Sequence, residues 1–188
     1  MGSMSSVARI KGDAFTLLKE EHRQIKDLLE EFVSAPDVVS KQQICDQVLS
    51  RLMIHAKVEE EVFYPAVRKA LNNDEGHELV DEAQGQHYAV HKMIDELHTM
   101  PPSHRGYEAK FHVLAEAVIQ HIAEEEHDIF PRALEAAADW DHVAAQMQIA
   151  RVALQGRVGG HSAMGRELSR RETRRRVAAP PLWERHGK

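Results

Sequence analysis

Residues 55–65 read HAKVEEEVFYP and residues 121–131 read HIAEEEHDIFP, and these two stretches decide the fold. Each has a histidine, a glutamate four residues later, and an aromatic residue followed by proline at its end. The helices upstream match as well, because residues 22–30 align on residues 87–95 without gaps. We therefore expect two helical hairpins of one design, packed about a pseudo-two-fold axis. Pro65 and Pro131 each remove a helix hydrogen bond, and are expected to mark a kink or a stop.

Four segments have the apolar spacing of amphipathic helices, at about residues 13–32, 38–70, 75–98 and 107–137. Short stretches rich in Pro, Asn, Asp, Ser and Gly separate them. Helices joined by short loops pack as antiparallel neighbours. The predicted fold class is therefore all-α, an antiparallel up-down-up-down four-helix bundle. We expect the bundle at residues 4–137, an additional C-terminal helix at residues 138–156, and a basic, mobile tail at residues 157–188.

Charge is divided unevenly along the chain, whose formal net charge is −6. Residues 156–188 hold nine Lys/Arg against three Asp/Glu, so the rest of the chain is strongly acidic. An acidic body repels phosphates, which makes a nucleic acid an unfavourable partner, whereas the basic tail suits docking on the body or a protein partner. No apolar run reaches the roughly 20 residues that a membrane span needs. Cys45 is the single cysteine and cannot form an internal disulfide, so a cytoplasmic location is expected.

Each of the four predicted helices carries a histidine on its apolar face, and two of them add a glutamate. At a rise of about 1.5 Å per residue, counting from the loops places all of these side chains at one depth in the bundle. Residues spaced i, i+4 lie on one helix face, and buried polar groups need a partner. Seven residues therefore form a candidate metal-ligand set: His22, His55, Glu59, His87, His91, His121 and Glu125. Imidazoles and carboxylates suit first-row metals such as iron, and the uneven histidine count would leave one ion with an open position.

This order of residues, H…HxxxE…HxxxH…HxxxE on four helices, resembles the hemerythrin-like, or HHE cation-binding, domains over about residues 13–135. The resemblance implies a non-haem di-iron centre, with two Fe ions bridged by an oxo or hydroxo group and held by the same seven residues. Some members of that family place an aspartate five residues after the last histidine, where this chain has Glu126. Helical phase and the internal repeat both favour Glu125. Tyr64 and Tyr88 stand beside ligand positions, from which they could reach the metal shell, but packing in the core is their expected role.

The resemblance implies an iron-binding protein that interacts with dioxygen, nitric oxide or peroxide, in oxygen binding or sensing or in defence against reactive oxygen. Two alternatives stay open: a catalase-like enzyme that decomposes peroxide, and an iron-responsive regulatory module that signals through the basic tail. Ferritin-like di-iron oxidases are disfavoured, since they use Glu-x-x-His pairs with a carboxylate majority. The sequence leaves open the physiological ligand, catalytic turnover, the oligomeric state, and occupancy by manganese or zinc instead of iron.

Overall fold

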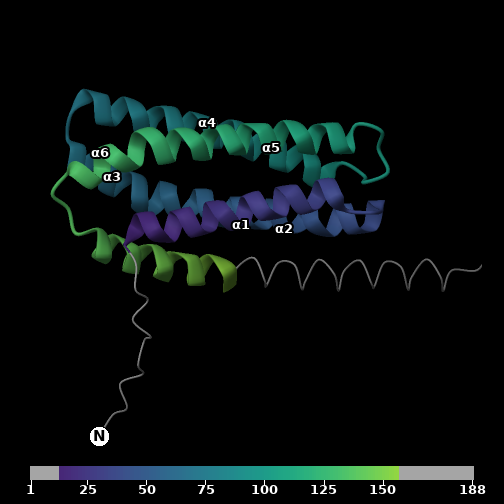
Figure 1. Ribbon diagram of the computed structural model, residues 1–188, viewed down its shortest axis with the longest axis horizontal. Helices are drawn as coiled ribbons and strands as arrows, with labels where there is room; N and C mark the ends of the chain where they lie inside the picture. The colour runs from purple at the N-terminus through teal and green to yellow at the C-terminus, as the bar shows by residue number, and fades with distance from the viewer. Residues whose placement is uncertain (1–12, 157–188) are drawn as a thin grey trace, which may run out of the picture. The chain divides into compact units, whose positions relative to one another are not determined.

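The computed structural model describes residues 13–156. Of these, residues 13–151 belong to one compact unit. Its four long helices are α1 (Ala14–Ser34), α2 (Val38–Val58), α4 (Asp74–Thr99) and α5 (Tyr107–Glu124). They pack antiparallel in the predicted all-α bundle, with α1 beside α2 and α4 beside α5 (Figure 1). Two shorter helices, α3 (Tyr64–Leu71) and α6 (Phe130–Glu135), prolong α2 and α5.

Residues 140–156 are helical, in agreement with the expected additional helix. The predicted domain boundaries remain predictions, and the basic tail at residues 157–188 lies outside the described residues. None of the helices within residues 13–156 combines the length and the apolar character that a membrane span requires.

Side-chain caps begin the helices where the sequence suggests a turn. Asp13 accepts a hydrogen bond from Thr16 N at 2.8 Å, and Asp37 accepts one from Ser40 N at 2.9 Å. At the end of α3, Asn72 adopts the left-handed conformation with φ 46°, which asparagine tolerates better than most residues. Asn73 then caps α4. These caps fix where α1, α2 and α4 begin and where α3 ends.

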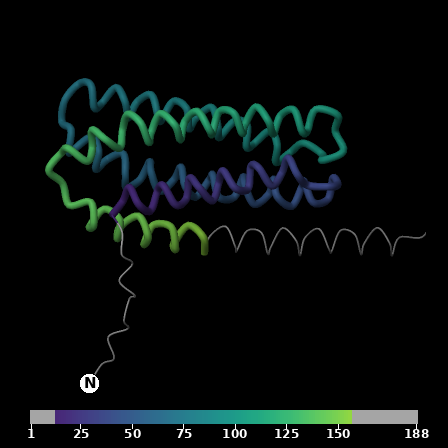
Figure 2. Tube along the Cα trace, viewed as in Figure 1, coloured from purple at the N-terminus to yellow at the C-terminus, as the bar shows by residue number. Residues whose placement is uncertain are grey.

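Each stretch that ends in an aromatic residue and proline contains one π-helical turn, η1 (Glu59–Phe63) after α2 and η2 (Glu125–Ile129) after α5. Proline lacks an N–H and its ring clashes with the carbonyl four residues back, so a wider turn relieves both problems. Tyr64 N–H donates to Glu59 O, and Phe130 N–H donates to Glu125 O. The chain continues as helix beyond both prolines (Figure 2). The expected kink or stop is therefore a π turn, and it begins at the glutamate of each repeat.

Apolar side chains pack on either side of the level of His22 along α1. Toward the end of α1, Phe32 stacks on Phe111 with ring centroids 3.6 Å apart, within a large aliphatic core. Near its start, Phe15 makes edge-on contacts with Phe63, Phe130 and Trp140 at 4.8–5.8 Å. Aromatic pairs of this kind contribute about 0.5–1.5 kcal/mol each beyond burial. The polar side chains of the repeats are held between these two apolar regions.

Candidate metal centre

Six of the seven predicted ligands converge in the middle of the bundle. Each is at most 5% exposed, which is exceptional for histidine and glutamate unless they are paired. They come from all four long helices and from the first residue of each π turn. The six are His22, His55, Glu59, His87, His121 and Glu125.

The six side chains form two groups that share a carboxylate. In the first group, which we term the first position, His22 Nε2 lies 3.2 Å from Glu125 Oε2 and His55 Nε2 lies 3.2 Å from Glu59 Oε1. In the second position, His87 Nε2 lies 3.3 Å from Glu59 Oε2 and 3.1 Å from the Nε2 atom of His121. Glu59 belongs to both groups, and Glu125 Oε2 is 4.0 Å from His121 Nε2. Two carboxylates thus lie between two pairs of imidazoles.

Most of the inward-facing atoms of this cluster have no hydrogen-bond partner. Both oxygens of Glu59, both oxygens of Glu125, and the Nε2 atoms of His22 and His55 are buried without one. Leaving buried polar atoms unpaired costs about 1–3 kcal/mol each, and more for charged groups. A cation is the partner that carboxylate oxygens and neutral imidazole nitrogens share, so the residues present fit a pair of metal ions.

Each of the four histidines is held from behind through its Nδ1 atom. His22 Nδ1 lies 2.8 Å from Glu126 Oε1, and His87 Nδ1 lies 3.2 Å from Glu60 Oε1. Glu21 lies 2.9 Å from Nδ1 of His55, and Gln86 lies 2.8 Å from Nδ1 of His121. A proton on Nδ1, donated to these oxygens, leaves Nε2 free to face the centre, which is how ligand histidines are oriented in metal sites.

The electrostatics of the cluster match a site built for positive charge. Burial would lower the pKa of His22, but the carboxylates of Glu125 and Glu59 raise it to about 10. Burial would also lower the pKa of His87, but the carboxylates of Glu59 and Glu60 raise it to about 9. Burial raises the pKa of Glu125 to about 7, helped by the negative charge of Glu59. In the metal-free protein, protons therefore neutralise the buried carboxylates.

His91 is the predicted ligand that the structure places outside the cluster. Its ring is 35% exposed, and its Nε2 atom lies 3.5 Å from Glu60 Oε1. The same place in the first hairpin is taken by Lys26, whose Nζ lies 3.7 Å from Glu126 Oε1. His91 therefore contacts the carboxylate that supports His87. With two histidines in each group, the uneven count behind the expected open position is absent from this cluster.

Glu125 and Glu126 take different places. Glu125 points into the cluster and is 1% exposed, whereas Glu126 lies behind His22. Tyr64, fully buried, places its hydroxyl 3.3 Å from His87 Nε2, so it lies beside the second position as well as in the core. In the other half, Phe130 stacks on the His22 ring at 5.9 Å. Tyr88 is 64% exposed, so its expected place in the core is wrong.

Sequence reasoning missed the side chains that support the histidines. The repeat carries the signal for them, since Glu21 and Gln86 each precede a histidine of the cluster and Glu60 and Glu126 each follow its glutamate. The repeat also pairs His91 with Lys26, and lysine is not a metal ligand in such sites. Comparing both copies position by position indicates which residues face the centre.

The fold and the cluster together define an all-helical bundle with a buried cation-binding site. The family model described as hemerythrin HHE cation binding domain matches residues 13–133. The chain belongs to this family, which confirms the resemblance drawn from the sequence.

A solved structure and two curated proteins show where similar chains occur. The crystal structure of an HHE cation-binding domain-containing protein from Mycobacterium kansasii, a homologue of Rv2633c, has a TM-score of 0.67 and 26% identity, covering 77% of this chain and 88% of that one. Rv2633c of Mycobacterium tuberculosis is 28% identical over 123 residues, 63% of this chain and 71% of its own length. A DNA nickase of Nostoc sp. (strain PCC 7120) is 25% identical over 151 residues, 78% of this chain. The chain spans only 41% of that nickase.

Proposed function

We propose that the protein is a non-haem di-iron protein that binds a small oxidant, namely dioxygen, nitric oxide or peroxide, for oxygen binding, sensing or defence. The observation that carries the proposal is the set of unpartnered oxygens of Glu59 and Glu125 between two histidine pairs. His22 and His55 would hold one ion, His87 and His121 would hold the other, and the two glutamates would serve both. Iron would supply reversible electron exchange with the small ligand.

The arrangement of the donors supports two ions over one. Besides Glu59 and Glu125, three carboxylates contact the backs of the histidines, those of Glu21, Glu60 and Glu126. Three cationic side chains offset this outer charge, because Arg151 pairs with Glu21, Lys26 approaches Glu126 and Lys57 lies 3.8 Å from Glu60. The two inner carboxylates, Glu59 and Glu125, then remain between two pairs of histidines, so each pair can hold an ion beside a carboxylate oxygen.

The test is anaerobic loading of metal-free protein with Fe²⁺, followed by metal analysis and optical spectra before and after exposure to oxygen, nitric oxide or peroxide. We expect two irons per chain and new near-ultraviolet and visible bands. His121→Ala should lose at least one iron, whereas His127→Ala, at an exposed position on the same helical segment, should keep both. Parallel loading with Mn²⁺ and Zn²⁺ separates iron from its competitors. Folded wild-type protein that refuses all three metals would contradict the proposal.

Peroxide decomposition is a second candidate, favoured by Tyr64. Burial, together with Glu125 and Glu59, raises the pKa of its phenol well above the usual value, so the hydroxyl keeps its proton. A buried hydrogen-bond donor beside the second position is suited to stabilising an oxygen atom of peroxide. Tyr64→Phe should therefore slow oxygen evolution from peroxide about 100-fold while leaving iron content unchanged. Tyr88→Phe, on the surface of α4, is the matched control.

The DNA nickase relative does not extend the proposal to nucleic acid. The match leaves most of that protein uncovered, and the acidic body of this chain repels phosphates. The regulatory alternative depends on the basic tail, which lies outside the described residues. DNA binding measured at several salt concentrations, for the full chain and for a chain without residues 157–188, tests both nucleic-acid binding and a role of the tail.

A further inference from the structure

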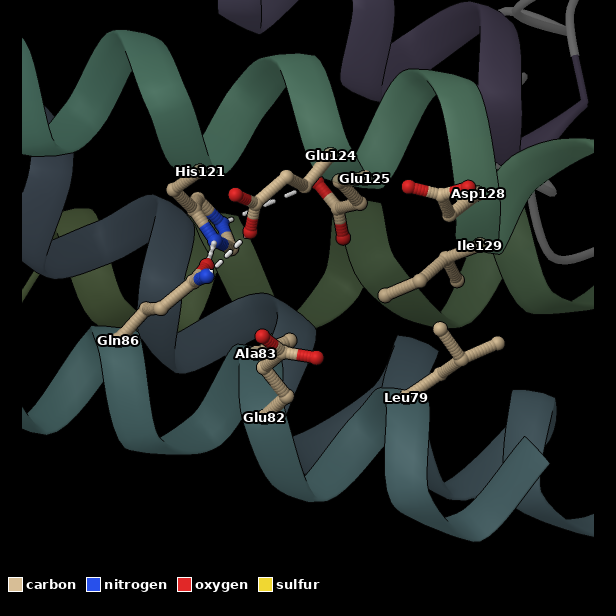
Figure 3. A pocket seen from close by; sticks show the side chains of 9 residues that line it. All are labelled: Leu79, Glu82, Ala83, Gln86, His121, Glu124, Glu125, Asp128 and Ile129. Carbon is tan, nitrogen blue, oxygen red and sulfur yellow. Dashed lines mark hydrogen bonds and ion pairs between the residues drawn. The ribbon is translucent and has the colours of Figure 1, made fainter. Parts of the chain in front are cut away.

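A pocket of about 260 Å³ lies between α4 and the segment formed by α5 and η2. Figure 3 shows its lining: Glu82 and Gln86 project from α4, and Glu124 and Asp128 come from the opposite segment. His121 and Glu125 also line it, so the pocket reaches the second position of the centre.

The carboxylates that line this pocket range from exposed to buried side chains. Glu82 and Asp128 are exposed, Glu124 is half-buried, and Glu125 is 1% exposed. Both oxygens of Glu125 lack a hydrogen-bond partner, so the pocket leads to a buried carboxylate that can receive a cation. Aligned negative groups in a concave surface concentrate cations and raise their association rates by roughly 10–1,000-fold.

The other hairpin has apolar residues at the equivalent places. By the alignment of the repeats, Leu17 corresponds to Glu82, Val58 to Glu124 and Val62 to Asp128. The helix that begins at Trp140 contacts the first hairpin, because Trp140 packs against Phe15 of α1. Arg151 pairs there with Glu21, the counterpart of Gln86, and places a positive charge behind His55. A cation approaching from that side would meet apolar packing and an arginine.

We propose that the pocket lined by Glu82, Gln86, Glu124 and Asp128 is the entrance through which hydrated ferrous ions reach the centre. This inference rests on the proposed function and concerns the route of the metal. The exposed carboxylates would attract the ion, and Glu125 would receive it from the inner end of the pocket. Gln86 lies at the boundary, because its oxygen accepts from His121 Nδ1 and its amide donates to Glu124. The ion held by His87 and His121 then exchanges with solvent faster than the ion held by His22 and His55.

The experiment measures the rate of anaerobic Fe²⁺ uptake by the metal-free full chain. Uptake is stopped at timed intervals with a ferrous chelator, and the iron retained after desalting is counted. The pocket variant combines Glu82→Gln, Glu124→Gln and Asp128→Asn. Its control removes the same charge at exposed positions elsewhere on the bundle, and combines Glu30→Gln, Asp95→Asn and Glu116→Gln.

At low ionic strength we expect the pocket variant to load at least about tenfold more slowly than wild type, while still reaching two irons per chain. The control should load within about twofold of wild type, and added salt should slow wild type far more than the pocket variant. Two single substitutions at exposed residues of α4 control for misfolding. Glu82→Lys should slow Fe²⁺ uptake, whereas Glu78→Lys, one turn away and outside the pocket, should not.

Equal rates for the pocket variant and the control would overturn the entrance and leave the di-iron proposal intact. A pocket variant that binds fewer ions at equilibrium would also overturn it, because these carboxylates would then be resident ligands. Wild-type protein that takes up no metal would overturn both proposals together.

Discussion

The hairpin of α1 and α2–η1 and the hairpin of α4 and α5–η2 place the same side chains in the centre, and differ in what surrounds them. Each contributes two histidines and one glutamate, and each glutamate starts a π turn. Around them, Glu21 in the first hairpin corresponds to Gln86 in the second, and Tyr64 corresponds to Phe130.

The inward-facing residues and their surroundings are therefore under separate constraints. Under the proposed function, glutamate and histidine recur because two ions would need equivalent donors, whereas the neighbours decide how exposed and how basic each donor is. The first position has a carboxylate behind each histidine and an aromatic ring against His22. The second position has a neutral amide behind His121, a phenol beside His87 and an acidic pocket leading to it.

The largest expected effect comes from the carboxylate that both hairpins use. Glu59 approaches His55 in one group and His87 in the other. Since loss of a supporting residue costs about 10–100-fold in metal affinity, Glu59→Gln should cost more than about 100-fold at both positions. Titration of metal-free protein with Co²⁺ measures this. Retention of one tight ion would show that Glu59 serves a single position.

A strong dependence of metal affinity on pH should follow from the protons in the metal-free cluster. His22 and His87, with pKa values of about 10 and about 9, are protonated at neutral pH and must lose those protons to bind metal. Affinity should therefore fall as pH falls from 9 to 7, by about tenfold per pH unit for each displaced proton. Below the pKa of Glu125, about 7, a third proton competes.

The same shifts predict the opposite trend for the metal-free fold. A histidine whose folded pKa is raised stabilises the fold below its unfolded pKa of about 6.5, and that stabilisation is lost as pH rises through the folded value. Metal-free protein should melt at lower temperature at pH 9 than at pH 7.

Calorimetry in buffers of different ionisation enthalpy counts the protons released on metal binding. A pH-independent affinity would contradict the buried proton–carboxylate network.

Exchanging the two outer residues that differ between the hairpins should have an intermediate effect. Glu21→Gln removes the carboxylate behind His55 and should weaken the ion at the first position about tenfold. Gln86→Glu places a carboxylate behind His121 and should strengthen the ion at the second position by a similar factor. Stepwise Co²⁺ titration separates the two affinities. Identical responses of both steps to both changes would deny that the positions are distinct.

The smallest effect is expected from His91, although the sequence places it among the ligands. Because it contacts Glu60 from a part-exposed position, His91→Ala should change affinity by less than about tenfold and leave two ions bound. Lys26→Ala, at the equivalent place in the first hairpin, is the matched comparison. Loss of an ion from the His91 variant alone would restore it to the ligand set.

The helices, their antiparallel order and the level of the centre were predictable from the sequence. Apolar spacing sets the buried face of each helix, and Asp13, Asp37 and Asn73 set where three of them begin. Glu125 could be favoured over Glu126 because an i, i+4 pair shares a helix face.

The π turns and the outer residues could not be read from periodicity. A π turn depends on how the backbone relieves Pro65 and Pro131, and a fixed step of 3.6 residues cannot represent it. His91 satisfies the i, i+4 rule with His87, but that rule does not say how far a side chain lies from the centre. In the structure the His91 ring is 35% exposed and contacts Glu60. The presence of an acidic pocket in one hairpin could be recognised only from the three-dimensional structure, because Glu82, Glu124 and Asp128 come from two helical segments.

Diffraction from crystals of the iron-loaded protein, recorded on either side of the iron absorption edge, would show whether the six residues hold two ions. We expect two anomalous peaks, one beside His22 and His55 and one beside His87 and His121, with Glu59 and Glu125 contacting the metal and His91 apart from it. A single peak, or a peak ligated by His91, would contradict it.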